Sequence, residues 1–511
     1  MNNGAVDLVK TLLKSGVDTC FANPGTSEMH FVAALKNHPQ MRSVLCLFEG
    51  VVTGAADGYG RMAGKPAVTL LHLGPGLANG LANLHNAKKS HTPIVNVIGD
   101  HATFHKPLDA PLNSDVQGTA APYSHVVLTS RSADTVSADV AAAVAAANSK
   151  GGQIVSLVLP ADAAWNETSG KINQCSRDAR IKVDQSSIET AVSLLSNGRK
   201  TGLVLGGQAC FGEGLTLAEA IAEATGVTLM TSYATARLER GSHRVPITRI
   251  PFPVPLAVEL LADFEQLIFL GAKEPVAFFA YPGLPSRVCD PGCNLFDLAD
   301  PTSDILDALH RLNEQFEAPR TPREIETPIM PVVSEGALTP DTLADVVACS
   351  LQEGTILVDE GVTSTRGVFD KTAHGPRHDL LVNVGGSIGA GLPLALGAAV
   401  ACPDRPVLCL SGDGSASYTP QALWSIMQQD ANVTIVICAN HTYAILKIEM
   451  ERVGAILPDQ NQHPLLDIDT PKIDWVALAT GYGMPATRVT TAEALAKEIA
   501  RGGPRLIEAS L

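Results

Sequence analysis

Apolar and polar positions follow helix-like and strand-like patterns in turn along residues 1–165. A helical pattern covers 4–15 and ends at Gly16, and a second one, made of small residues, covers 51–63. Short apolar runs predict strands between such helices, namely TCFA, SVLCLF, PAVTLLHL and PIVNVIGD. Strands that alternate with helices favour a parallel sheet covered by helices on both faces.

Two polar segments interrupt this pattern. The first covers 166–185, and the second, near 316–338, is rich in proline, glutamate and arginine, as linkers are. Strand-like runs resume after each segment, such as TGLVLGG after the first and RPVLCLSGDG after the second. The expected fold is therefore α/β, with three doubly wound parallel-sheet domains at 1–165, 186–315 and 339–511.

Composition narrows the classes of function. Apolar residues make up 45% of the chain and charged residues 17%, which excludes intrinsic disorder. The net charge of −15 would repel polyanions, so no nucleic-acid partner is expected. The apolar stretch 380–403 contains several glycines and Pro393, so it predicts a buried helix rather than a membrane span. The ten scattered cysteines lack the paired spacing of a zinc site and favour a reduced, cytoplasmic protein.

The segment Gly412-Asp413-Gly414-Ser415 comes directly after an apolar strand, and Asn440 comes at the end of the next one. Adjacent parallel strands bring their carboxyl ends to one edge of a sheet, where ligands bind. An Asp, an Asn and a nearby backbone carbonyl would offer hard oxygen ligands to Mg²⁺ or Ca²⁺ bridging a diphosphate. On these residues alone, an ordinary Gly-Asp-Gly turn remains the alternative.

These residues resemble the fingerprint of thiamine-diphosphate-dependent enzymes, in which GDG is followed by two Asn residues. Ala439 replaces the first Asn, whereas Asn440 matches the family's metal ligand and Thr442 its carbonyl donor. NHTYAIL is similar to the NNGTYG segment of benzoylformate decarboxylase. Three further segments resemble the family in the same order, namely FANPGTSEMHF, LFEGVVTGAADGYGR and GGSIGAGLPLALGAA. The middle domain matches only loosely.

The resemblance implies thiamine diphosphate and Mg²⁺ as cofactors, with the ion held by Asp413, Asn440 and the carbonyl of Thr442. It implies that Glu49 is the catalytic carboxylate, desolvated at a strand edge and sharing a proton with the pyrimidine N1′. Gly386 would offer its carbonyl to the 4′-amino group. Ile388 would bend the cofactor, with an ordinary core residue as the alternative. The other expected cofactor contacts are Asn23, Pro24, Gly25, Thr363, Ser364, Gly412, Gly414, Ser415 and Tyr443.

The substrate side of the site is less complete. His72 stands where the decarboxylase has a histidine that relays protons, so we expect it to be catalytic. Thr26 takes the position of an active-site serine, and its hydroxyl would bind a substrate carboxylate. The decarboxylase's second histidine has no match, because Phe278, Phe279 and Ala280 occupy that region.

Two other features bear on the site. His101 and His105 follow the strand PIVNVIGD in a loop that could line the site, although a polar loop is expected rather than a metal pair. Acetolactate synthase carries FAD in its middle domain, and no matching signature occurs here, so FAD is not expected.

The resemblance implies a 2-keto acid enzyme. Loss of CO₂ followed by protonation would release an aldehyde (a decarboxylase, or lyase), and attack on a second carbonyl would give carboligation (a transferase). His72 favours the first outcome, and the GPG run after it, similar to that of acetolactate synthase, favours the second. An idle cofactor-binding paralogue is a third possibility, disfavoured by the retained Glu49. The family's site lies between two chains, so we expect a homodimer at least, and a homotetramer as the assembly.

Overall fold

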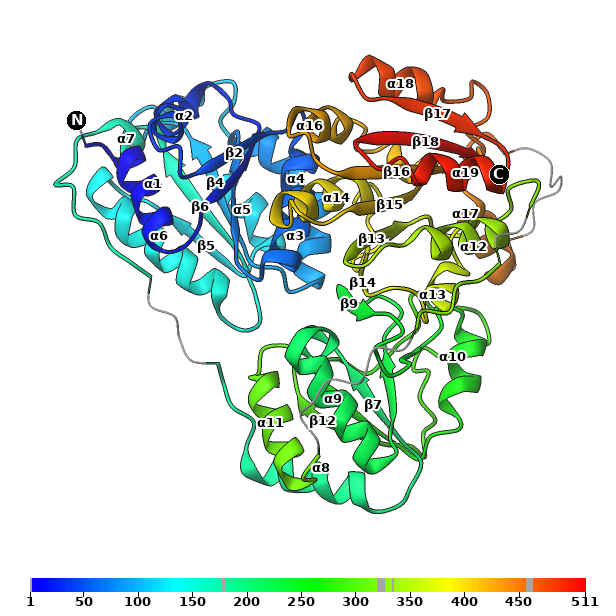
Figure 1. Ribbon diagram of the computed structural model, residues 1–511. Helices are drawn as coiled ribbons and strands as arrows, with labels where there is room; N and C mark the ends of the chain where they lie inside the picture. Colours follow the sequence, from blue (N-terminus) through cyan, green and yellow to red (C-terminus); the bar gives the residue numbers. More distant parts are fainter. Residues whose placement is uncertain (1, 176–179, 319–326, 333–334, 456–462) are drawn as a thin grey trace.

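The computed structural model describes residues 2–175, 180–318, 327–332, 335–455 and 463–511. Their strands form three sheets (Figure 1), of six, five and seven strands. The sheets are parallel throughout except for one edge pair, so the predicted α/β fold with parallel sheets is confirmed. No helix in these ranges is long and apolar enough to cross a membrane.

The first sheet has the strand order β2-β1-β3-β4-β6-β5. Its four interior strands are buried along their whole length, as expected for a sheet with helices on both faces. The strands are β1 (Thr19–Ala22), β2 (Arg42–Leu45), β3 (Ala67–Leu71), β4 (Ile94–Asp100), β5 (Val126–Thr129) and β6 (Ile154–Pro160). The helices are α1 (Gly4–Lys14), α2 (Met29–Lys36), α3 (Glu49–Ala63), α4 (Leu73–Lys89), α5 (Val116–Ala120), α6 (Ala133–Asn148) and α7 (Ala161–Trp165).

The middle sheet has the order β10-β8-β7-β11-β12. Its strands are β7 (Thr201–Leu205), β8 (Thr228–Thr231), β10 (Thr248–Arg249), β11 (Gln266–Leu270) and β12 (Asn294–Ala299). Its helices are α8 (Gln185–Ser196), α9 (Gly212–Thr225), α10 (Val254–Leu261) and α11 (Ile305–Gln315). The strand β9 (Arg237–Arg240) leaves this unit and pairs antiparallel with β14 of the last sheet (Figure 1).

The last sheet has the order β17-β18-β16-β15-β13-β14-β9. Its own strands are β13 (Thr355–Glu360), β14 (His378–Val382), β15 (Val407–Gly412), β16 (Val433–Ala439), β17 (Ala486–Val489) and β18 (Arg505–Ser510). Its helices are α12 (Pro340–Ser350), α13 (Val368–Lys371), α14 (Gly391–Ala401), α15 (Asp413–Ala416), α16 (Ala422–Gln428), α17 (Ala444–Arg452), α18 (Trp475–Gly481) and α19 (Ala492–Ile499). The buried helix predicted within 380–403 is confirmed as α14.

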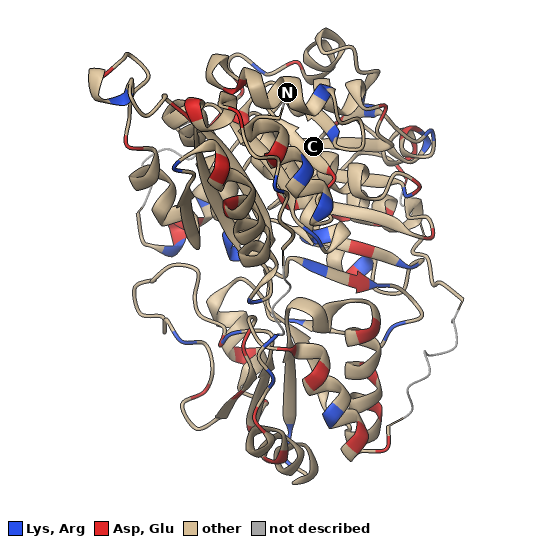
Figure 2. Cartoon of the chain, turned by 90° about the vertical axis from the view of Figure 1, so that its left-hand side faces the viewer, with Lys and Arg blue, Asp and Glu red and all other residues tan. Residues whose placement is uncertain are grey.

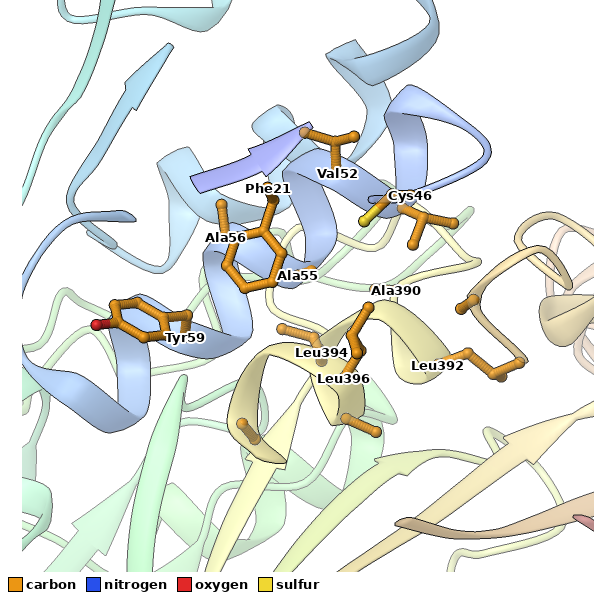
Figure 3. Close-up of a cluster of buried hydrophobic side chains, with 14 of the residues drawn as sticks. Phe21, Cys46, Val52, Ala55, Ala56, Tyr59, Ala390, Leu392, Leu394 and Leu396 are labelled. Carbon is orange, nitrogen blue, oxygen red and sulfur yellow. The ribbon is translucent and has the colours of Figure 1, made fainter. Parts of the chain in front are cut away.

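Helices α3 and α14 join the first and last units through small residues. A Cβ on Gly397 would overlap the carbonyl of Ala55, and one on Gly54 would lie 2.6 Å from Cβ of Pro393. Glycine therefore lets the two backbones approach closely. Figure 3 shows the apolar side chains of this contact, with Phe21 and Val52 on one side and Leu394 on the other.

Arg61, at the end of α3, ties all three units together. Its guanidinium pairs with Asp57 at 2.6 Å and donates to the carbonyls of Val382 at 2.7 Å and Ala236 at 3.1 Å. Its side chain is only 2% exposed, so this charge is buried with its partners. Elsewhere, acidic and basic residues occur side by side on the helices of each unit (Figure 2).

Candidate active site

His72 lies at the carboxyl end of β3, directly before the first residue of α4. Its Nδ1 lies 2.9 Å from Oε2 of Glu28 and 3.3 Å from Oγ of Ser27. A Cβ on Gly25 would overlap the imidazole ring, so the turn formed by Asn23, Pro24, Gly25 and Thr26 needs glycine at that position. The structure thus brings the predicted turn and the predicted histidine together. The side chain of Thr26 is exposed beside them.

Glu28 is a site residue that the sequence interpretation missed. It is 3% exposed, accepts from the backbone N–H of Gly25 at 2.8 Å and rests against Gly99, where a Cβ would overlap its carboxylate. A carboxylate at Nδ1 holds a proton on that nitrogen and leaves Nε2 as the position that exchanges protons. The available signal was a Glu three residues after Gly25, the spacing of a capping box.

Glu49 is the first residue of α3 and is 7% exposed. Asn79, on the facing helix α4, donates its Nδ2–H to Oε2 of Glu49 at 3.0 Å. Gly76 lies against the other carboxylate oxygen, since a Cβ there would be 3.2 Å from Oε1. The preceding strand β2 ends at Leu45, earlier than the run SVLCLF predicted, because it is an edge strand with mostly exposed residues.

Asp413 and Asn440 lie at neighbouring strand ends, as predicted, because Gly412 pairs with Cys438 in the β15–β16 ladder. Asp413 is 2% exposed, and its two oxygens accept from the N–H groups of Gly414 at 2.9 Å and His441 at 2.8 Å. Burial raises the pKa of Asp413. A cation bound there would offset this cost of burying the charge.

Thr442, the third predicted metal-binding residue, lies beside Asn440. Asn440 Oδ1 accepts from the N–H of Thr442 at 3.1 Å, and the Thr442 hydroxyl donates to Asp467 at 2.7 Å. Across the described residues, no three His, Cys, Asp or Glu side chains gather as a metal site. An ion here would therefore rest on one carboxylate together with amide and carbonyl oxygens, which suits Mg²⁺.

The predicted diphosphate contacts lie beside these donors. A Cβ on Gly414 would be 2.5 Å from Cε1 of Tyr443, so the tyrosine ring packs directly on the glycine. Ser415, in α15, is buried. In the turn after β13, Ser364 is buried and donates its N–H to the carbonyl of Gly361 at 3.0 Å, whereas Thr363 is half-buried.

The glycine-rich loop before α14 is held by Glu360, which sequence reasoning also missed. Its two oxygens accept from the N–H groups of Ala390 at 2.9 Å and Gly391 at 2.8 Å, and burial raises its pKa. Within the loop, Gly386 has φ of +80° and is exposed, and Ile388 is half-buried. The loop therefore offers bare backbone to a ligand.

Within one chain, helix α4 separates His72 from the glycine-rich loop that precedes α14. His72 stands at its N-terminus, whereas Asn86 near its other end donates to the carbonyl of Ser387 at 2.8 Å. His85 Nε2 also lies 3.1 Å from the carbonyl of Gly385. The helix rise puts these ends ~20 Å apart. His72 and the glycine-rich loop of the same chain therefore lie at opposite ends of α4.

His101 and His105 lie together in the loop after β4. The rings of His101 and His105 lie 5.6 Å apart. Among the described residues, Nε2 of His101 is buried without a hydrogen-bond partner.

Phe278 stands in the region where the decarboxylase has its second histidine. Its ring packs against Gly386, where a Cβ would be 2.8 Å from Cζ of Phe278.

Comparison with known proteins identifies the family. Residues 2–117 match the model of the thiamine pyrophosphate enzyme N-terminal TPP binding domain, and residues 364–509 match that of the C-terminal TPP binding domain. The chain is 46% identical over 511 residues to a Mycobacterium tuberculosis protein named "Putative acetolactate synthase large subunit IlvX", covering 99% of this chain and 98% of that one. The chain belongs to the thiamine-pyrophosphate enzymes. The resemblance proposed from the sequence is confirmed.

Two further relatives of this thiamine-pyrophosphate enzyme are decarboxylases. Benzoylformate decarboxylase of Pseudomonas aeruginosa is 29% identical, covering 97% of this chain and 96% of its own. The solved structure of a thiamine diphosphate-dependent 4-hydroxybenzoylformate decarboxylase of Rhodococcus jostii superposes with a TM-score of 0.87 at 25% identity, covering 100% of this chain and 99% of its own. The relatives of this chain thus include proteins named as decarboxylases and proteins named as acetolactate synthases.

The residues present fit thiamine diphosphate. In the last unit, Asp413 and Asn440 supply hard oxygens, and Gly386 and Gly412 leave backbone accessible. In the first unit, Glu49 supplies a buried carboxyl. These are the groups that a diphosphate with its cation and an aminopyrimidine require.

Proposed function

We propose that this enzyme uses thiamine diphosphate and Mg²⁺ to decarboxylate a 2-keto acid and release an aldehyde. When bound, the cofactor supplies a nucleophilic carbon for the ketone and accepts the electron pair left by CO₂. The observation that carries the proposal is the half-buried His72, paired with the buried Glu28 beside the turn at Gly25, because aldehyde release needs a proton donor.

Proton transfer falls to two residues of the first unit. Glu49, buried and oriented by Asn79, would hold a proton at N1′ of the pyrimidine. His72 would donate a proton from Nε2 to the carbon that has lost CO₂, since its Nδ1 is engaged by Glu28. The exposed hydroxyl of Thr26 would bind the substrate carboxylate.

The last unit would hold the cofactor. Asp413, Asn440 and the carbonyl of Thr442 would bind Mg²⁺, which neutralises the diphosphate. The carbonyl of Gly386 would accept from the 4′-amino group, and Ile388 would support the bend between the rings. The remaining contacts would come from Asn23, Pro24 and Gly25 and from Thr363, Ser364, Gly412, Gly414, Ser415 and Tyr443.

Two chains would complete each site. His72 and the Gly386 loop of one chain lie at opposite ends of α4, so a partner's loop would face the first chain's Glu49 and His72. A homodimer is then the smallest active unit. A homotetramer of two such dimers and a cytoplasmic location are also proposed.

Carboligation is the second candidate. The name of the relative at 46% identity favours it, as does the run Gly74-Pro75-Gly76 after His72. In this case the carbon that has lost CO₂ attacks a second keto acid instead of taking a proton.

A panel of 2-keto acids, assayed with thiamine diphosphate and Mg²⁺, tests the proposal. We expect CO₂ release with aldehyde as the main product. Hydroxyketone as the main product would favour the second candidate, and no CO₂ from any member of the panel would contradict both.

A further inference from the structure

A row of four aromatic rings runs from the middle unit to the glycine-rich loop. Ring centroids lie 5.3 Å apart between Tyr233 and Phe252, 5.4 Å between Phe252 and Phe278, and 4.9 Å between Phe278 and Phe279. All three spacings fall within the range of favourable ring contacts. The rings therefore form one continuous apolar surface.

The third ring of this row, Phe278, meets the loop at Gly386. A Cβ on Gly386 would lie 2.8 Å from Cζ of Phe278, so the ring edge rests on bare backbone. Phe278 is 49% exposed and Phe279 is 57% exposed. Large apolar side chains exposed together mark a surface that binds something.

Two arginines contact the rings at the Tyr233 end of the row. The Arg249 guanidinium lies 5.0 Å from the Tyr233 ring centroid and 4.0 Å from that of Phe369. Arg452 lies 5.8 Å from the ring centroid of Phe252. Cation–π contacts of this kind stabilise the positions of Tyr233 and Phe252.

We propose that Phe278 and Phe279 form the wall that selects the side chain of the 2-keto acid, and that they favour a branched or aryl side chain over the methyl group of pyruvate. The inference rests on the proposed function, which places the cofactor at Gly386. A substrate side chain is the occupant the contact favours, because Phe278 touches the backbone that would face the reacting molecule. A large apolar group would cover the two exposed rings, whereas a methyl group would leave them in water.

The ratio of kcat/KM values tests this wall, with 3-methyl-2-oxobutanoate and benzoylformate each compared with pyruvate. The wild type should prefer at least one of the bulky substrates by about tenfold or more, the range that one apolar contact supplies. Phe278→Ala should lower that ratio by about tenfold, and Phe278→Leu, which keeps apolar volume, should lower it less. A ratio is insensitive to the fraction of enzyme that is folded.

Phe316→Ala is the matched control, because Phe316 caps α11 in the same unit and lies outside the ring row. It should leave the ratio unchanged. A wild type that prefers pyruvate would overturn the inference alone, and one that turns over no 2-keto acid would overturn the proposed function with it. If Phe278→Ala changed the native mass and left the ratio intact, the ring would be a contact between chains and the inference would be wrong.

Discussion

The first and last sheets follow the same order, β2-β1-β3-β4-β6-β5 in one and β14-β13-β15-β16-β18-β17 in the other. In each, the turn after the first strand, the start of the helix after the second, and the ends of the third and fourth strands face the same edge. The topology is the same, but the side chains at these positions differ in kind.

The first unit places the two residues proposed to transfer protons at this edge. Glu49 begins the helix after its second strand and His72 ends its third. The last unit places a glycine-rich loop and Asp413 at the corresponding positions, and Asn440 at the end of its fourth strand. Under the proposed function, one backbone arrangement would serve proton transfer in one unit and cation binding in the other, because the residues at the strand ends differ while the fold is shared.

The contrast between the first and last units fails most clearly if Glu49 has no role in proton transfer. In Glu49→Gln the amide cannot exchange the N1′ proton, so exchange of the C2 proton of bound thiamine diphosphate should slow by about 10²–10⁴-fold. Deuterium exchange followed by NMR measures this rate. Cofactor affinity should change little, and a wild-type exchange rate in the variant would remove Glu49 from the mechanism.

His72 tests the second proton-transfer position. His72→Ala should slow aldehyde release by about 10²-fold relative to CO₂ release, because water replaces the imidazole poorly. Added acceptor aldehyde should then divert product to a hydroxyketone. Glu28→Gln, which keeps His72 and removes only the charge at Nδ1, should have a smaller effect and alter the pH profile of kcat. An unchanged aldehyde-to-hydroxyketone ratio in His72→Ala would exclude this role.

The last unit is tested by Asp413→Ala, which removes the carboxylate proposed to bind Mg²⁺. Affinity for thiamine diphosphate in the presence of Mg²⁺ should fall about 100-fold, since even residues that only orient metal ligands are worth about 10–100-fold. Calorimetric titration measures this affinity, and chelation of Mg²⁺ in the wild type should reproduce the loss. Asp474→Ala, an exposed helix cap in the same unit, should bind normally. Equal affinity in Asp413→Ala and wild type would disprove the cation site.

The contact between the two units is tested by Gly397→Ala. The new methyl group would overlap the carbonyl of Ala55, so the free energy of unfolding should fall by about 1–3 kcal/mol. Gly481→Ala is the control, because a Cβ there meets no atom within 4 Å. Denaturant unfolding of both variants gives the comparison, and equal losses would mean that α3 and α14 do not require close approach.

The sequence predicted those features that depend on neighbours along the chain. Apolar runs located β15 and β16, so the adjacency of Asp413 and Asn440 followed from parallel pairing. The strand β9 was missed because its sequence, RLER, is charged. Its charges are compensated by residues distant in sequence, for example Arg237 by Asp379 at 2.7 Å. Glu28 was missed for the same reason, since its partner His72 is distant in the chain.

The most direct test of complementary units is to combine two inactive chains. Glu49→Gln and Asp413→Ala each disable every site of a homodimer. In a mixed dimer, one site would carry both changes and the other would carry neither. Co-expression and purification of mixed dimers with two different affinity tags should therefore restore 2-keto acid decarboxylation, which neither variant shows alone. Mixed dimers that bind thiamine diphosphate and remain inactive would contradict a site built from the first unit of one chain and the last unit of its partner.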